Sequence, residues 1–204
     1  MNEYVKLPFI FNINGSCGSG KSYFIQYLVK CLKNSFNCVI VFSNTANFTN
    51  DYEFLKELGI KNFIFSSLDV DEKIKKIMAI QKKNRQKDNP ANVLIIFDDI
   101  LGTIKDNKIF KDLVSTFRHY RISIIFSVQY VSGSATYLRE ISNYVIIFNQ
   151  RTQNALKLCY ENYFADSYET FVSFKQDFVK KLQNYHFYFI DRIKNKKFIM
   201  VCPS

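Results

Sequence analysis

One short motif constrains the fold of this 204-residue chain more than any other feature. Residues 15–22 read GSCGSGKS and match the pattern GxxxxGK[ST], which forms a loop whose backbone N–H groups point inward around an anion. The apolar run 9–14 before the motif predicts a buried strand, and the amphipathic stretch 23–29 after it predicts a helix. A strand, a glycine-rich loop and a helix in this order predict a phosphate-binding loop in an α/β protein.

Each position of this motif has an expected part in binding a nucleoside triphosphate. Lys21 is expected to reach the β- and γ-phosphates, and the Ser22 hydroxyl is expected to be a ligand of Mg²⁺. The rest of the loop is expected to surround the phosphates with backbone N–H groups. These residues are Gly15, Ser16, Cys17, Gly18, Ser19 and Gly20.

A second apolar run, 93–97, ends in two carboxylates, Asp98 and Asp99. Such a run predicts a central parallel strand that delivers acidic groups to the carboxyl edge of a sheet. Asp98 is expected to hold the Mg²⁺ bound to Ser22, directly or through water, and Asp99 to polarise the attacking water. A strand that merely enters a polar turn would give the same local pattern. The phosphate loop upstream favours the metal-binding interpretation.

Composition and charge limit the classes to which the chain can belong. A hydrophobic content of 48% predicts a sizeable core and excludes disorder. No apolar run reaches the roughly 18 to 20 residues that a membrane span needs, so a soluble, intracellular protein without a membrane partner is expected. The five scattered cysteines lack metal-ligand spacing and predict reduced thiols.

The positive charge is concentrated in the second half of the chain. Residues 101–204 carry 15 basic and 8 acidic side chains and so supply +7 of the net charge of +10. This imbalance predicts a polyanionic partner, most simply nucleic acid. A solvated, lysine-rich surface is the alternative explanation.

Strand-like and helix-like segments alternate along the chain. Strands are expected at 9–14, 38–42, 62–65, 93–97, 122–127 and 144–148. Helices are expected at 21–34, 51–58, 70–87, 107–117, 134–142, 153–163 and 168–184. The alternation predicts a mostly parallel central sheet flanked by helices, and the runs 186–191 and 197–201 predict a C-terminal β-hairpin. We expect a single domain over 1–204, with a core at about 5–150 and an extension at about 151–204.

A third segment carries the closest family resemblance. Residues 117–129, FRHYRISIIFSVQ, predict a buried strand that ends in a polar residue, Gln129. With the two motifs above, it resembles the FtsK/HerA superfamily of DNA-pumping ATPases, and within it the poxvirus-type genome-packaging ATPases of large DNA viruses and virophages. These proteins join GxxxxGK[ST], an apolar strand ending in Asp-Asp, and an Arg-His pair followed by a short strand ending in Ser-x-Gln. The resemblance covers about residues 7–150.

The resemblance implies a RecA-like P-loop fold that binds ATP and Mg²⁺. In that fold the strand ending near Gln129 lies between the strands that lead to the phosphate loop and to Asp98, and Gln129 contacts the γ-phosphate or the attacking water. The resemblance also implies a ring, a hexamer or pentamer, in which a neighbour's arginine completes each site. Arg139 is the first candidate for this arginine, followed by Arg118 and Arg151.

The function implied is an ATP-driven motor that translocates double-stranded DNA and packages a viral genome into a capsid. The implied partners are duplex DNA, further copies of the chain and a capsid or portal protein, in the virion or the cytoplasm of an infected cell. Two other classes stay open: a small P-loop nucleotide or nucleoside kinase, and a nucleotide-binding regulatory switch. The chain lacks the Asn-Lys-x-Asp motif that reads guanine, which weighs against the switch.

Overall fold

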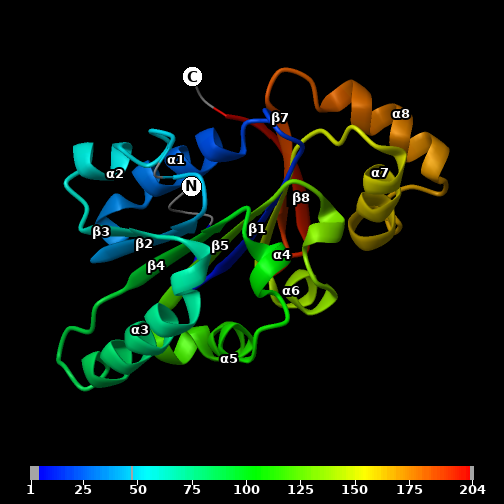
Figure 1. The fold of residues 1–204 in the computed structure, drawn as a ribbon. Coiled ribbons are helices and arrows are strands. Elements are labelled where there is room, and N and C mark those ends of the chain that lie inside the picture. The colour runs from blue at the N-terminus through cyan, green and yellow to red at the C-terminus, as the bar shows by residue number, and fades with distance from the viewer. Residues whose placement is uncertain (1–4, 47, 203–204) are drawn as a thin grey trace.

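The computed structural model describes residues 5–46 and 48–202, which form a single eight-stranded sheet (Figure 1). The strand order is β3-β2-β4-β5-β1-β6-β7-β8. The strands are β1 (Ile10–Asn14), β2 (Cys38–Ser43), β3 (Asn62–Phe65), β4 (Val93–Asp98), β5 (Ile122–Val128), β6 (Tyr144–Ile147), β7 (His186–Asp191) and β8 (Lys196–Val201). Strands β1 to β6 run parallel, whereas β7 and β8 add an antiparallel hairpin next to β6. The predicted α/β fold and C-terminal hairpin are confirmed.

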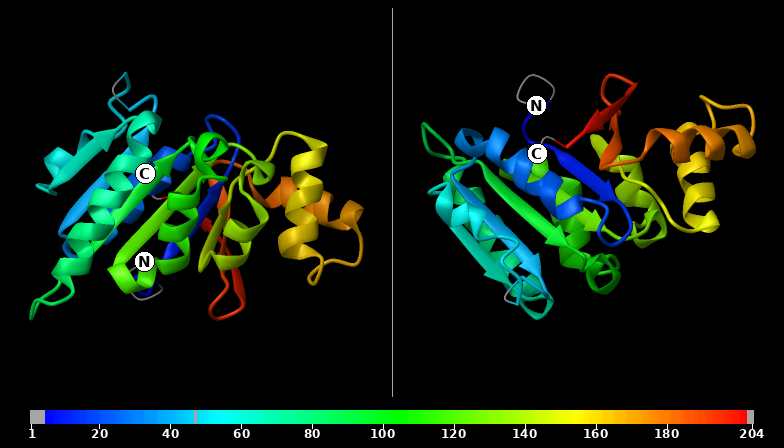
Figure 2. Two further views of the ribbon diagram at one scale, coloured as in Figure 1. Left: turned by 60° about the horizontal axis from the view of Figure 1, so that its bottom comes forward. Right: turned by 90° about the horizontal axis from the view of Figure 1, so that it is seen from above.

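Helices cover both faces of the sheet, as Figures 1 and 2 show. They are α1 (Lys21–Cys31), α2 (Phe54–Glu57), α3 (Val70–Asn84), α4 (Leu101–Ile104), α5 (Lys108–Thr116), α6 (Thr136–Ile141), α7 (Gln153–Cys159) and α8 (Phe171–Lys181). Helices α1 and α2 share one apolar core with the sheet, and α3 to α6 share a second core. Helices α7 and α8 pack against the far end of the sheet in a third. Among the described helices, none has the length and apolar character needed to cross a membrane.

The order of the central strands decides where the sequence motifs meet. Strand β5 lies between β1 and β4, as the family resemblance implied. Asn14, the last residue of β1, pairs with Val128 on β5, and Asp98, the last residue of β4, pairs with Ser127. The carboxyl ends of the three strands are therefore level, and the segments that follow them lie at one edge of the sheet. Helices cover both faces of these strands, which explains their continuous apolar runs.

Several helices are shorter than the sequence predicted. The helix expected at 21–34 ends at Cys31, and the one expected at 70–87 ends at Asn84. Buried Gln81 holds the last turn of α3 by donating to the carbonyl oxygens of Ala91 (3.0 Å) and Tyr120 (2.8 Å). The four-residue helix α4 was not predicted, because so short a helix has no detectable periodicity. The helix expected at 153–163 is α7 followed by a π-helical turn.

Candidate active site

The phosphate loop leaves the end of β1 and leads directly into α1. Its first N–H group, on Gly15, donates to the carbonyl oxygen of Val128 at 3.2 Å and so ties the loop to β5. Gly18 and Gly20 have φ angles of +72° and +104°, in the region that glycine adopts without steric cost. A Cβ on Gly15 would stand 2.8 Å from the Cβ of Phe148, which is too close for any side chain. The path of the loop therefore requires glycine at these positions.

The side chain of Lys21 folds back over the loop. Its ammonium group donates to the carbonyl oxygens of Gly15 at 2.7 Å and Ser16 at 3.0 Å. Partial burial lowers the pKa of Lys21, and the charges of Asp99 and Asp98 oppose that decrease. Phosphate oxygens are stronger acceptors than carbonyl oxygens because they are charged. Lys21 is thus placed to exchange its loop partners for a phosphate group.

Asp98 sits at the end of β4 among buried polar groups. Burial is the main cause that raises the pKa of its carboxyl group, and the negative charge of Asp99 raises it further. The hydroxyls of Tyr52 and Ser127 and the positive charge of Lys21 act in the opposite direction. Within the described part of the chain, neither hydroxyl makes a hydrogen bond of normal length and angle. The sequence analysis did not identify these two hydroxyls. Ser127 belongs to the Ser-x-Gln ending of β5, which could have indicated it, whereas no local pattern points to Tyr52.

Asp99, predicted to polarise the attacking water, lies in direct contact with Gln129, predicted to contact the γ-phosphate or that water. The side-chain amide of Gln129 donates to Oδ2 of Asp99 at 2.5 Å. Asp99 has a φ of 54°, which is uncommon for a residue with a Cβ, and its N–H group donates to the carbonyl oxygen of Ser127 at 3.0 Å. This backbone turn directs the Asp99 carboxylate toward the segment after β5. The structure therefore brings the two residues together although 29 residues separate them in the chain.

The oxygen donors at this edge fit Mg²⁺. Ser22 is exposed on the first turn of α1, and the Asp98 carboxylate ends the strand opposite. Mg²⁺ prefers oxygen ligands and commonly uses one or two protein groups together with phosphate oxygens and water. The buried hydroxyls of Tyr52 and Ser127 are placed to orient Asp98. Ser22 and Asp98 therefore stay the predicted ligands of Mg²⁺.

Arg139 lies away from the phosphate loop of its own chain. Its guanidinium donates to the hydroxyl of Thr136 at 3.0 Å, to the amide oxygen of Asn162 at 3.2 Å, and to the carbonyl oxygen of Ser134. Helix α6 leads back to the amino edge of the sheet, opposite the phosphate loop (Figure 1). No hydrogen bond between described residues joins Arg139 to the loop.

The other two candidate arginines differ sharply in position. Arg118 lies in the turn before β5, at the amino edge of the sheet, with its guanidinium 5.3 Å from the ring centre of Phe117. Arg151 follows β6 and donates to the carbonyl oxygen of Cys17 in the phosphate loop at 3.3 Å. Arg151 is therefore next to the site of its own chain, which the sequence analysis did not foresee.

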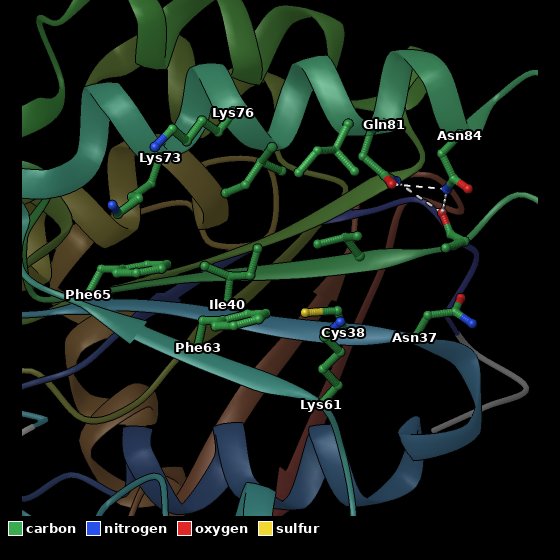
Figure 3. Close-up of a pocket in the computed structure, with 14 residues that line it drawn as sticks. Asn37, Cys38, Ile40, Lys61, Phe63, Phe65, Lys73, Lys76, Gln81 and Asn84 are labelled. Atoms are coloured by element: carbon green, nitrogen blue, oxygen red, sulfur yellow. Dashed lines mark hydrogen bonds between the residues drawn. The ribbon is translucent and has the colours of Figure 1, made fainter.

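A separate hollow of about 430 Å³ lies between α3 and the strands β2 and β3 (Figure 3). Its floor is apolar, with Ile40 and Phe63 on the strands, and Lys73 and Lys76 reach over it from α3. None of residues 15–22 lines this hollow. It is distinct from the site at the carboxyl edge.

Sequence comparison identifies the family of the chain. The family of the poxvirus A32 protein matches residues 1–191. The chain belongs to this family. The uncharacterized protein 075L of Invertebrate iridescent virus 6 is 30% identical over 156 residues, which make up 73% of this chain and 57% of that protein. This A32-family chain thus spans little more than half the length of that curated relative.

Two of the solved structures that share the fold of this A32-family chain illustrate the likeness. The genome packaging NTPase B204 from Sulfolobus turreted icosahedral virus 2, in complex with ATPγS, has a TM-score of 0.70 at 19% identity, over 96% of this chain and 98% of that one. EssC (ATPases 2 and 3) from Geobacillus thermodenitrificans has a TM-score of 0.62 at 16% identity, over 97% of this chain and 40% of that one. The predicted P-loop fold and the predicted poxvirus-type family are confirmed.

Proposed function

We propose that this chain is an ATP-hydrolysing motor that translocates double-stranded DNA and packages a viral genome into a capsid. One observation carries the proposal: Lys21, Asp98, Asp99 and Gln129 converge at one edge of the sheet, beside the phosphate loop. Hydrolysis of ATP uses a cation on the phosphates, a metal-side acid, a group that orients the attacking water and a contact to the γ-phosphate. These four side chains supply those groups.

Each group has a definite part in the proposed reaction. The loop N–H groups and Lys21 bind the β- and γ-phosphates. Mg²⁺, when bound by Ser22 and Asp98, supplies charge neutralisation on the phosphate oxygens. Asp99 accepts a hydrogen bond from the attacking water, whose oxygen bonds to the γ-phosphorus while the bond to the β–γ bridging oxygen breaks. The proton that the water loses passes to the Asp99 carboxylate, and the products are ADP and inorganic phosphate. Gln129 is placed to exchange its hydrogen bond with Asp99 for one to the γ-phosphate or the water.

The partners of the proposed motor follow from its charge and family. A net charge of +10 offers many contacts to DNA phosphates, and such contacts carry no sequence information. We propose a hexameric or pentameric ring in which Arg139 of one subunit, or Arg118 in its place, completes the site of the next. A capsid or portal protein is the proposed further partner, in the virion or the cytoplasm of an infected cell.

ATPase rates with and without duplex DNA test the proposal. We expect DNA to stimulate hydrolysis and Lys21→Ala to abolish it, because that change removes the cation on the phosphates. Asp99→Asn should stop turnover while ATP still binds, and Lys30→Ala, on the exposed last turn of α1, should leave the rate unchanged. Binding to DNA should weaken steeply with salt and be indifferent to sequence. An ATPase rate that is the same with and without duplex DNA would contradict the proposed motor function.

A further inference from the structure

We propose that the C-terminal part of the chain supplies the nucleoside-binding half of the site, with Tyr185 stacking on the base of the bound nucleotide. This inference rests on the proposed function, because it concerns the part of ATP that the phosphate loop does not hold. Apart from Arg151, the residues of the extension 151–204 had no role predicted from the sequence. The proposal gives that extension a direct part in nucleotide binding.

A cavity of about 520 Å³ adjoins the phosphate loop. This volume lies within the range of roughly 300–1,000 Å³ that is typical of small-ligand sites. The phosphate loop forms one wall, the segment after β6 forms a second, and the turn between α8 and β7 forms a third. The lining residues are Ser16, Gly18, Ser19, Asn149, Arg151, Leu182, Gln183, Asn184, Tyr185 and His186.

The position of the cavity matches the direction that a bound nucleotide must take. Asp98, Asp99 and Gln129 lie at the carboxyl ends of β4 and β5, on one side of β1, whereas β6 and β7 lie on its other side. A triphosphate whose γ-phosphate faces Asp99 therefore directs its nucleoside away from β5. That direction leads toward β6 and β7, where the cavity lies.

Two side-chain hydrogen bonds join the cavity wall to the phosphate loop. The hydroxyl of Ser16 donates to the carbonyl oxygen of Asn149 at 3.4 Å, and the guanidinium of Arg151 donates to the carbonyl oxygen of Cys17 at 3.3 Å. The Arg151 side chain is exposed and places a permanent positive charge beside the loop. The segment after β6 and the phosphate loop thus form one continuous surface, which carries the positive charge of Arg151.

The turn before β7 presents an aromatic ring at the same place. Asn184 and Tyr185 have φ angles of 50° and 63°, a conformation that residues with a Cβ rarely adopt. The ring atom Cδ1 of Tyr185 lies 3.2 Å from the point where a Cβ on Gly20 would stand, so the ring is next to the end of the phosphate loop. Even so, Tyr185 is 64% exposed. An exposed aromatic ring can stack on any nucleobase, because every base has a π-face.

The remaining groups in the cavity wall suit a nucleoside. Asn149, Gln183 and Asn184 carry side-chain amides, each with both donor and acceptor atoms. Such groups can bind the hydroxyls of a ribose and the polar edge of a base. No residue of the phosphate loop lines the hollow under α3, so a ligand in that hollow would not be in contact with the loop.

Tryptophan fluorescence tests the stacking directly, because the natural chain has no tryptophan. In a Tyr185→Trp variant, Mg²⁺-ATP is expected to quench the emission, whereas Mg²⁺-tripolyphosphate, which has no base, is expected to leave it unchanged. Phe63→Trp, in the hollow under α3, is the matched control and should respond to neither. Equal responses of the Tyr185→Trp variant to both ligands, or no response to ATP, would overturn the proposal.

Calorimetric titration provides the second measurement. Tyr185→Ala should weaken ATP binding about tenfold, the scale of one base stacked on an aromatic ring, and leave tripolyphosphate binding within about twofold. Because alanine keeps the Cβ, the left-handed backbone at residue 185 carries the same cost in the Tyr185→Ala protein as in the natural chain. Tyr185→Phe keeps the ring and should bind ATP like the natural chain. Parallel loss of both ligands, or loss of neither, would contradict the stacking role.

Lys21→Ala separates failure of this inference from failure of the proposed function. If ATP affinity depends on Lys21 but not on Tyr185, only the stacking role is wrong. If ATP affinity does not depend on Lys21, the nucleotide does not bind at the phosphate loop and the proposed function itself fails.

Discussion

Asp98 shows a conflict between stability and function within one side chain. The proposed reaction needs its carboxylate charged, to hold Mg²⁺. The fold opposes that charge, because burial raises the pKa of Asp98 above its ordinary value of 3.8. The native chain therefore holds a proton at pH values where the unfolded chain has released it. The contribution of Asp98 to the free energy of unfolding therefore falls as pH rises from about 4 through the raised pKa, and the full penalty applies above it.

Asp98→Asn should remove this penalty. We expect the variant to have a larger free energy of unfolding than the natural chain at pH 7 without nucleotide, while losing ATPase activity. The difference in stability should shrink as the pH is lowered through the raised pKa, and it should vanish only below about pH 3, where the natural carboxyl group is protonated in both states. Urea denaturation at several pH values measures it, with exposed Asp88→Asn as the control that shows no such trend. Equal or lower stability of Asp98→Asn at pH 7 would contradict this account.

Among the elements, α5 shows how a single side chain can fix where a helix begins. The side-chain oxygen of Asn107 accepts from the N–H groups of Ile109 (2.8 Å) and Phe110 (3.2 Å). Its amide nitrogen donates to Asp71 on α3 at 2.7 Å. The cap thus orients the helix that packs Phe110 and Leu113 against the strands β4 and β5.

Asn107→Ala should lower the free energy of unfolding by about 1 kcal/mol, because the first N–H groups of α5 lose their acceptor. Asn107→Ser keeps a capping oxygen and should recover part of that loss. Exposed Asn154→Ala on α7 is the control, expected to stay within about 0.5 kcal/mol of the natural chain. Chemical denaturation measures all three, and an Asn107→Ala protein as stable as the control would show that the cap contributes little.

At the scale of the whole molecule, the two arginines Arg139 and Arg151 predict opposite results in mixed rings. Arg139→Ala and Lys21→Ala proteins should each be inactive alone. If Arg139 acts on the neighbouring site, mixing them should restore measurable ATPase activity, because some interfaces then pair an intact Lys21 with an intact Arg139. Joining a ring would require Arg139 to exchange its hydrogen bonds with Thr136 and Asn162 for contacts to the neighbour.

Arg151→Ala mixed with Lys21→Ala is the matched comparison. Arg151 contacts the phosphate loop of its own chain, so no subunit in that mixture has both groups, and no activity should return. Recovery of ATPase activity in this second mixture would indicate that Arg151 is the arginine that completes the neighbouring site. Lack of recovery in the first, with mixed oligomers confirmed by mass, would exclude Arg139 and leave Arg118 as the candidate.

The sequence by itself determined the parts of the site that depend on local geometry. The spacing of glycines fixes the phosphate loop around its anion, and apolar runs that end in Asp98 or Gln129 place those residues at the ends of buried strands. The carboxyl ends of parallel strands meet at one edge, so the pattern of strands and helices placed Asp98 and Asp99 at the same edge as the phosphate loop. The place of Gln129 beside them was implied by the family resemblance.

Only the tertiary structure decided which distant residues join them. Tyr52 lies beside Asp98, Arg151 beside Cys17 and Tyr185 beside Gly20 because of how the loops and the C-terminal hairpin fold against the sheet. The antiparallel pairing of β7 with β6 brings the turn at 182–186 to the carboxyl edge, and a hairpin paired elsewhere would have the same local pattern. Partner choice between strands depends on packing across the whole molecule, and no short stretch of sequence contains that information.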